Sequence, residues 1–360
     1  MKKNSPITIQ DVARQAEVSV STVSNVLNGR AERMRPETLA RVQDAIRTLQ
    51  FSPSRLAQQL KTGQTPLLGL LVPSLANPMY GAIAREIETC ARDPHGLRLL
   101  IGSTYRDPAM EAAFFDDLLA HGVRRVIVIS SLAEERHLES AVARGMQVMS
   151  YDRRATPGKP SGIGHVTPDN VATARLATEH LIAQGHTRLA FVTVAGMTLS
   201  RGDKIDGFRA AVEAAGLGPA ARVLDGGPLN EYGDSVIAEV GRATGVHLAA
   251  DPRRPTGLVA LNDMMALGLL AGLREGGLRV PQDISVVGLD GLFLGALSNP
   301  GLTTVQLPVR EMARAMVDGV MRPRGASAEP HQQVFTTHQL VERESVAPPL
   351  SPRPAQKRAR

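Results

Sequence analysis

The structure of the first fifty residues depends on the stretch VSVSTVSNVLNG, which occupies positions 18–29. Ser19 is a good helix N-cap, because its hydroxyl can accept a hydrogen bond from a backbone amide of the first turn. Apolar side chains then recur at helical spacing, which predicts a helix over 20–27 with one inward face. That face consists of Val23, Val26 and Leu27. Asn28 and Gly29 suit the left-handed conformation that ends many helices.

Helices are also predicted on both sides of this stretch. Thr8 and Asp11 have the spacing of a capping box and open a short helix. Its apolar face consists of Ile9, Val12, Ala13 and Ala16. Pro36 suits the first position of a third helix, which continues through Leu49. Two short helices joined by a tight turn and followed by a third form the helix-turn-helix layout. A small three-helix bundle with a solvated Ser/Thr face is the alternative interpretation.

Positive charge is concentrated at the two ends of the chain, whose formal net charge is +6. Residues 1–63 hold ten basic and five acidic side chains, and residues 351–360 hold four basic and no acidic ones. A basic head indicates a polyanionic partner, most simply double-stranded DNA, although a solubilising surface would look the same. Short side chains on the outward face of the 20–27 helix can reach base edges and phosphates. They belong to Val20, Ser21, Thr22, Ser24 and Asn25.

A short linker helix is predicted over the hinge, residues 51–63. Ser52 can cap it, Pro53 can begin it and Gly63 can end it, but two turns are too few for stability alone. Its leucines have little nearby sequence to bury them. This pattern is typical of a segment that folds on DNA and wedges a leucine into the minor groove. An ordinary interdomain linker is the alternative.

These segments resemble the lactose/galactose repressor (LacI/GalR-type) family of bacterial transcriptional regulators. The resemblance rests on TIQDVA at 8–13, the stretch at 18–29 and the hinge sequence SPSRLAQQL at 52–60, and the pattern extends from residue 7 to residue 345. It implies that bases are read by Val20, Ser21 and Asn25. It implies phosphate contacts by Ser19, Thr22, Ser24 and Asn28. On the hinge it implies DNA contacts by Ala57 and Leu60, of which Leu60 matches the intercalating leucine. Asn25 stands where the family commonly has Arg.

From residue 67 onward, short apolar runs alternate with helical stretches. This alternation predicts parallel, doubly wound α/β sheets, and two such series predict two lobes. The expected strands are 67–72, 98–101, 126–129 and 148–151 in the first series, and 189–194, 222–224, 257–260 and 284–288 in the second. The resemblance implies a periplasmic-binding-protein-like body in which the chain returns to the first lobe near its end.

The expected domain organisation follows from these patterns. Residues 1–50 form the helix-turn-helix head, 51–63 the hinge helix, and 64–345 an effector-binding and dimerisation core. One lobe is expected to combine 64–164 with 295–322, and the other to combine 165–294 with 323–345. The Pro-rich, basic residues 346–360 are expected to form a disordered tail.

Polar side chains at strand ends are the candidates for a small-molecule site, because ligands of doubly wound sheets bind beyond the carboxyl ends of the strands. The candidates are Asn77, Met79, Tyr80, Asp152, Asn262 and Asp290. Asn and Asp can form the paired hydrogen bonds that polyol hydroxyls need, yet each could equally be a turn residue or helix cap. The resemblance implies effector contacts by Asn262 and Asp290, and it places Lys204 where the family usually has an effector-clamping Arg.

The resemblance also implies the kind of effector. The family's stacking aromatic would fall near Pro228 and Leu229, so a flat purine would lose its stacking partner. Lys204 can meet a carboxylate or a hydroxyl without the planar match that Arg demands. We therefore expect a sugar or a sugar acid.

Composition excludes several other classes. Across 360 residues, 43% are hydrophobic and 21% charged, which is ordinary for a folded globular protein. No apolar run is long enough to span a bilayer, and the basic N-terminus is followed by polar residues and not by the apolar core of a signal peptide. The single cysteine, Cys90, fits a reducing cytoplasm. The loop at 196–204 lacks phosphate-loop spacing, and no metal-binding or nucleophile motif occurs. We expect no catalysis, no cofactor and no metal.

The sequence therefore predicts a cytoplasmic, homodimeric repressor that binds a near-palindromic operator and responds to a small effector. A sugar-binding solute receptor is the first alternative, and it has no use for residues 7–63. A sugar- or nucleotide-processing α/β enzyme is the second.

Overall fold

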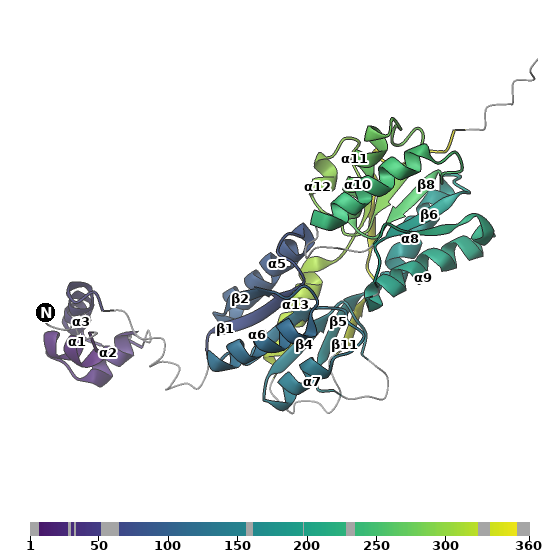
Figure 1. Cartoon of the computed structure of the whole chain (residues 1–360). Coiled ribbons are helices and arrows are strands. Elements are labelled where there is room, and N and C mark those ends of the chain that lie inside the picture. Colours follow the sequence, from purple (N-terminus) through teal and green to yellow (C-terminus); the bar gives the residue numbers. More distant parts are fainter. Residues whose placement is uncertain are drawn as a thin grey trace, which may run out of the picture. The chain divides into compact units, whose positions relative to one another are not determined.

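The structure, a computed structural model, describes residues 7–27, 30–31, 34–51, 65–155, 161–196, 198–227, 235–322 and 332–350 (Figure 1). The chain divides into two compact units, Met1–Thr65 and Pro66–Arg360, and each is described by itself. None of the described helices is both long and apolar enough to cross a membrane.

The first unit contains the three predicted helices, α1 (Ile9–Gln15), α2 (Val20–Leu27) and α3 (Pro36–Thr48). Their inward faces form one small core, which consists of Val12, Ala13, Ala16, Val23, Val42 and Ala45. Phe51 packs against this core. The rest of the predicted hinge helix, 52–63, lies outside the described residues.

The second unit has two lobes, each with a six-stranded sheet. The first sheet has the order β11-β5-β4-β3-β1-β2 and is parallel throughout. Its strands are β1 (Leu67–Val72), β2 (Arg98–Ser103), β3 (Arg125–Ile129), β4 (Gln147–Tyr151), β5 (Gly164–Pro168) and β11 (Gln332–Phe335). Its helices are α5 (Pro78–His95), α6 (Pro108–Ala120), α7 (Arg136–Ala143) and α13 (Val309–Met321). Two separate apolar clusters, one with α5 and α13 and one with α6 and α7, show that helices cover both faces.

The second sheet has the order β12-β10-β9-β8-β6-β7, and only β12 runs antiparallel to its neighbour. Its strands are β6 (Leu189–Thr193), β7 (Arg222–Asp225), β8 (Gly257–Ala260), β9 (Ser285–Gly288), β10 (Thr303–Gln306) and β12 (Gln339–Val341). Its helices are α8 (Asn170–Ala183), α9 (Leu199–Ala214), α10 (Ser235–Ala250), α11 (Asp263–Glu275) and the short α12 (Leu294–Leu297), with a 3₁₀ turn at Gly218–Ala220. Figure 1 shows α10 and α11 packed together, away from α8 and α9. The predicted fold class is confirmed.

The expected lobe boundaries are partly wrong. Residues 303–306 form β10, which pairs with β9 and β12 in the second lobe, although 295–322 was expected in the first. Conversely, β11 pairs with β5 in the first lobe, although 323–345 was expected in the second. From residues 295–322, Leu307 and α13 pack into the first-lobe core as expected. The chain crosses between lobes after β5, after β10 and after β11.

The expectation of a disordered tail over 346–360 is wrong for its first five residues. Val346 packs against the second-lobe core, and the backbone of Ala347 bonds to buried side chains. Its carbonyl accepts hydrogen bonds from Ser285 Oγ at 3.1 Å and from His186 Nε2 at 3.0 Å. Residues 346–350 are therefore part of the second lobe, and 351–360 lie outside the described residues.

Candidate functional site

The outward face of α2 carries the predicted DNA-reading residues. Ser19 caps the helix as expected, since its Oγ accepts a hydrogen bond from Thr22 N at 3.2 Å. Ser19, Val20, Ser21 and Asn25 are exposed, Thr22 and Ser24 are half-buried, and Val23 is buried beneath them. The other predicted DNA contacts, Asn28, Ala57 and Leu60, lie outside the described residues.

Local interactions fix the approach to this helix. The Thr8 amide and hydroxyl both donate to Asp11, which completes the predicted capping box and lowers the pKa of that carboxyl group. Glu17, in the turn before α2, has a φ of 52°, a left-handed conformation that favours glycine. Glu17 therefore adopts in this turn a backbone conformation that glycine would adopt more easily.

A cavity between the two lobes of the second unit collects all seven predicted effector residues. Its empty volume is about 640 Å³, part of which is open solvent. The predicted residues that line it are Asn77, Met79, Tyr80, Asp152, Lys204, Asn262 and Asp290. Leu307, which comes after β10, also lines the cavity. Pro228 and Leu229, near the expected position of the family's stacking aromatic, lie outside the described residues. Side chains separated by more than two hundred positions therefore meet at one place.

In the first lobe, the wall of the cavity combines a helix cap with a bound guanidinium. Asn77 caps α5, since its Oδ1 accepts from Met79 N at 2.9 Å. The cap interpretation is thus correct, and it leaves the amide nitrogen of Asn77 without a hydrogen bond to any other described residue. Arg106 donates to Tyr80 Oη at 2.6 Å and to the Ser130 carbonyl at 3.2 Å. These contacts hold a cation at the cavity wall.

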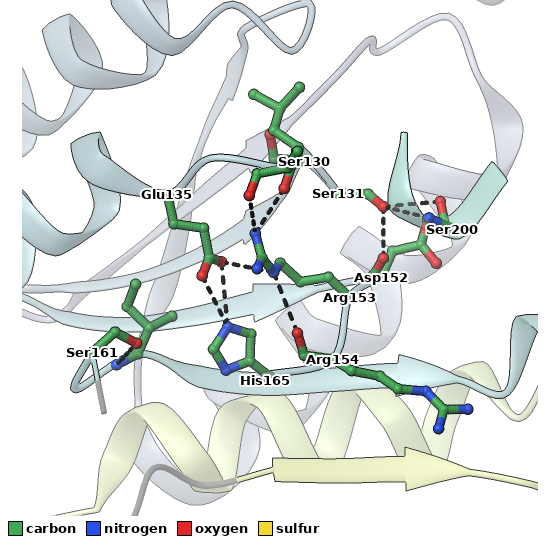
Figure 2. Close-up of polar contacts among 12 residues, drawn as sticks. Ser130, Ser131, Glu135, Asp152, Arg153, Arg154, Ser161, His165 and Ser200 are labelled. Atoms are coloured by element: carbon green, nitrogen blue, oxygen red, sulfur yellow. Dashed lines mark hydrogen bonds and ion pairs between the residues drawn. The ribbon is translucent and has the colours of Figure 1, made fainter. Parts of the chain in front are cut away.

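Asp152 occupies the junction between the lobes. It follows β4, has a φ of 72°, and its Oδ1 accepts from Asn170 Nδ2 at 2.9 Å. Its carbonyl oxygen lies 2.7 Å from Ser131 Oγ, which also lies 2.9 Å from Ser200 Oγ at the start of α9 (Figure 2). Asp152 is therefore bound through its carboxylate to α8 of the second lobe and through its backbone carbonyl to Ser131 of the first lobe.

In the second lobe, the cavity wall is built on the ends of β8 and β9. Lys204 Nζ donates to the Leu261 carbonyl at 3.2 Å, and Asn262 Oδ1 caps α11 by accepting from Met265 N at 2.9 Å. Asp290 Oδ2 accepts from Asp263 N at 3.3 Å. These contacts fix a cation, an amide and a carboxylate side by side at one end of the sheet.

Asp263 lies behind this wall, fully buried, and fixes the loop that carries Asp290. Its carboxylate accepts from Asp290 N at 3.2 Å, from Leu292 N at 2.7 Å and from Thr304 Oγ1 at 2.6 Å. Burial raises the pKa of Asp263, and the three donors oppose that rise. Asp263 therefore joins α11, the loop after β9 and β10.

Comparison with known proteins agrees with this layout. Residues 8–54 match the family model described as bacterial regulatory proteins, lacI family, and residues 178–346 match a periplasmic binding protein-like domain. The transcriptional regulator DegA of Bacillus subtilis is 30% identical over 349 residues, which is 95% of this chain and 98% of DegA. The chain belongs to the lacI family of bacterial regulatory proteins.

Solved structures of lacI-family regulators show the same architecture. The Lac repressor dimer, solved bound to operator and the anti-inducer ONPF, matches 95% of this chain and 100% of its own, with 26% identity and a TM-score of 0.79. The regulator CelR, solved as a complex with cellobiose, matches 94% and 99%, with 27% identity and a TM-score of 0.64. The chain is thus a DNA-binding transcriptional regulator with a helix-turn-helix head and a two-lobed core.

Sequence reasoning missed several polar residues of the cavity, namely Arg106, Asn170, Thr198, Ser200 and Arg201. Three of them, Thr198, Ser200 and Arg201, lie at the start of α9, which begins at Leu199. Thr198 caps this helix and would have been the signal for its true start. Arg201 is buried, and it donates to the carbonyl oxygens of the loop after β6, including that of Ala195 at 3.1 Å.

Proposed function

We propose that this lacI-family regulator is a repressor whose operator affinity is controlled by a sugar or sugar acid in the interlobe cavity. The observation that carries the proposal is the convergence of seven predicted residues, from both lobes, on that one cavity. A ligand that touches both walls would favour one arrangement of the lobes, and such differential contact is what allostery requires.

The chemistry of the lining supports a hydroxylated effector. Two carboxylates, those of Asp152 and Asp290, can accept hydrogen bonds from hydroxyls, and the amides of Asn77 and Asn262 can donate to them. Three cations line the same cavity, namely Arg106, Arg201 and Lys204. The excess of cations over carboxylates favours a ligand with an anionic group, and a neutral sugar can use the same donors. The likeness to CelR, which was solved with cellobiose, supports a carbohydrate.

Isothermal titration calorimetry on the full chain tests the effector class. The panel consists of neutral sugars, sugar acids, nucleosides and purine bases. We expect one of the first two classes to bind, and Asp290→Ala to weaken that binding about 100-fold, because a hydrogen bond to a charged group contributes about 1.5–3 kcal/mol. Asp206→Ala, on the exposed part of α9, is the matched control and should bind as wild type does. Tight binding of a purine base would overturn the proposed class.

The DNA site is proposed to be a near-palindrome read by two copies of α2. A two-fold dimer places its recognition helices in successive major grooves, and phosphate contacts make affinity fall steeply with salt. Selection of DNA fragments by the pure protein should yield one preferred sequence. Asn25→Arg should change the preferred bases while leaving the salt dependence nearly unaltered. Equal binding to all fragments would contradict the proposal and would favour the solute-receptor alternative.

Exposed apolar side chains on the core fit a homodimer, which we propose as the working form in the cytoplasm. Phe293 and Leu297, at α12, are 69% and 74% exposed, and Leu100 and Ile101 are exposed on the edge strand β2. A second copy of the chain would bury them across a two-fold axis. Sedimentation of Leu297→Asp should show monomers, and the variant should lose operator affinity, whereas Leu350→Asp should remain dimeric. A dimeric Leu297→Asp variant would show that the interface lies elsewhere.

A further inference from the structure

A buried charge cluster lies in the first lobe beside the Asp152 loop (Figure 2). Arg153 Nε lies 3.2 Å from Glu135 Oε1, and His165 Nε2, from β5, lies 3.3 Å from each carboxylate oxygen of Glu135. The side chains of Arg153, Glu135 and His165 are 5%, 11% and 2% exposed. None of the three lines the effector cavity.

Arg153 also ties together two loops that lie far apart in sequence. Its Nη1 donates to the carbonyl oxygens of Leu132 at 2.7 Å and Ala133 at 3.4 Å, both in the loop between β3 and α7. Burial lowers the pKa of Arg153 and the Glu135 carboxylate opposes that shift, so that the guanidinium stays charged. A buried cation needs such a partner, and Glu135 therefore keeps Arg153 in place between the loops.

The residues next to this cluster are held in conformations that they would not adopt unaided. Asp152, the neighbour of Arg153, has a φ of 72°, and Ser131, the neighbour of Leu132, has a φ of 59°. Side-chain-bearing residues are disfavoured in this left-handed region and persist there only when surrounding contacts fix them. Ser131 and Asp152 bond to each other, and Asp152 lines the effector cavity.

Ser131 is also the point at which this part of the first lobe holds α9 of the second lobe. Its carbonyl accepts from Leu199 N at 3.1 Å, and its Oγ accepts from Ser200 N at 3.1 Å. Helix α9 carries Lys204, which lines the cavity on the opposite side. A displacement of the 130–135 loop would therefore reach both walls of the cavity.

We propose that Glu135, Arg153 and His165 are positioning residues, which hold Asp152 at the effector cavity and Ser131 against the start of α9. The effect on effector affinity rests on the proposed function, whereas the effect on the contact between lobes does not. The other end of the 130–135 loop has a separate anchor, because Ser130 Oγ donates to the buried carboxylate of Glu111 at 2.8 Å. Loss of the Glu135 charge should therefore loosen the Leu132 carbonyl, which Arg153 binds, and with it the neighbouring Ser131, while the anchor at Ser130 keeps the lobe folded.

Hydrogen exchange of the full chain without effector tests the contact between lobes. In Glu135→Gln, the amides of Leu199 and Ser200 should exchange about tenfold faster than in wild type, because their acceptor on Ser131 is no longer fixed. Arg153→Lys keeps the charge pair but cannot reach Glu135 and both carbonyls at once, so it should show a smaller change in the same direction. The control is Glu134→Gln, whose side chain is 76% exposed, and it should exchange as wild type does.

A merely structural cluster would give a different pattern. Faster exchange confined to first-lobe peptides, with Leu199 and Ser200 unchanged, would overturn the proposal. If Glu135→Gln fails to show a cooperative melt, the same comparison is made with Arg153→Lys, which retains a buried cation and its carboxylate.

Calorimetry tests the effect on the cavity. With the sugar or sugar acid that binds wild type most tightly in the panel, Glu135→Gln should weaken binding about tenfold, which is the scale of a moderate allosteric coupling. If Glu135→Gln and the control Glu134→Gln both bound the effector as tightly as wild type does, the proposed effect on the cavity would be overturned. If no sugar or sugar acid binds wild type, the proposed effector class fails, and the exchange rates of Leu199 and Ser200 still decide whether the cluster positions the lobe contact.

Discussion

The two lobes share one architecture but stabilise their polar interiors in different ways. In the first lobe, buried carboxylates pair with side chains that carry or can carry positive charge, as in Glu135 with Arg153 and Glu111 with His137. In the second lobe, the buried carboxylate of Asp263 accepts from two backbone amides and one hydroxyl. The first arrangement joins separate loops or helices through long side chains, and the second fixes a strand end through short contacts.

This difference matters for the site, because each arrangement holds one cavity carboxylate. Asp152 directly precedes Arg153 in the sequence, and the Asp290 carboxylate accepts a hydrogen bond from the backbone of Asp263. Every donor to the Asp263 carboxylate belongs to the backbone or to a short side chain, so these groups have little freedom to move relative to one another. Ion pairs between long side chains can be re-formed in other geometries, so we expect the first-lobe wall to be the more adaptable one.

The largest effect should come from breaking the second-lobe network. Asp263→Ala leaves the amides of Asp290 and Leu292 and the hydroxyl of Thr304 without their acceptor, and each buried unsatisfied group costs about 1–3 kcal/mol. Urea unfolding should therefore show a loss of at least about 3 kcal/mol. Asp206→Ala, at an exposed position of α9, should change stability by less than about 0.5 kcal/mol. A loss below about 1 kcal/mol for Asp263→Ala would show that these groups find other partners.

A second comparison concerns a glycine packed between two helices and a glycine at an exposed helix position. A Cβ added at Gly268 of α11 would lie 1.9 Å from the Ala238 carbonyl oxygen of α10, whereas one added at Gly81 of α5 would meet nothing within 4 Å. Gly268→Ala should therefore destabilise by about 1–3 kcal/mol or more, because backbone must move. Gly81→Ala should stabilise by about 0.5–1 kcal/mol through helix propensity.

Thermal melts of the two alanine variants check this contrast directly. If Gly268→Ala melted at the wild-type temperature, α10 and α11 would be able to separate slightly without loss of packing, and the contrast between the two glycines would disappear.

The sequence predicted the site better than it predicted the lobes. All seven effector candidates line one cavity. Six of them were chosen because the carboxyl ends of parallel strands meet at one edge wherever the strands occur in sequence, and Lys204, within α9, came from the family resemblance alone. The strands β5, β10, β11 and β12 were missed, since runs of three to five residues carry too little periodicity. Arg106 was missed because it lies in a left-handed turn, at φ 58°, and not at the end of a strand. Tertiary contacts alone define these features.

The smallest predicted effect concerns the histidine of the second lobe. His186 is buried, with Nδ1 3.0 Å from Thr256 Oγ1 and Nε2 near Ser285 Oγ and the Ala347 carbonyl. Burial lowers the pKa of His186 below its ordinary value of 6.5. A lowered folded-state pKa means that the unfolded chain takes up the proton first as pH falls, so the stability contributed by neutral His186 is present above pH 6.5 and is lost below it.

The substitution His186→Gln removes this titration while retaining a donor and an acceptor for the same neighbours. Urea unfolding at several pH values between pH 5 and pH 8 should show wild type losing stability toward acid more steeply than the variant. The stability difference between them should therefore shrink as pH falls below 6.5. His247→Gln, at an exposed position of α10, is the matched control and should follow the wild-type profile. If wild type and His186→Gln lost stability in parallel as pH falls, protonation of His186 would have no cost in the free energy of unfolding, and the prediction would be wrong.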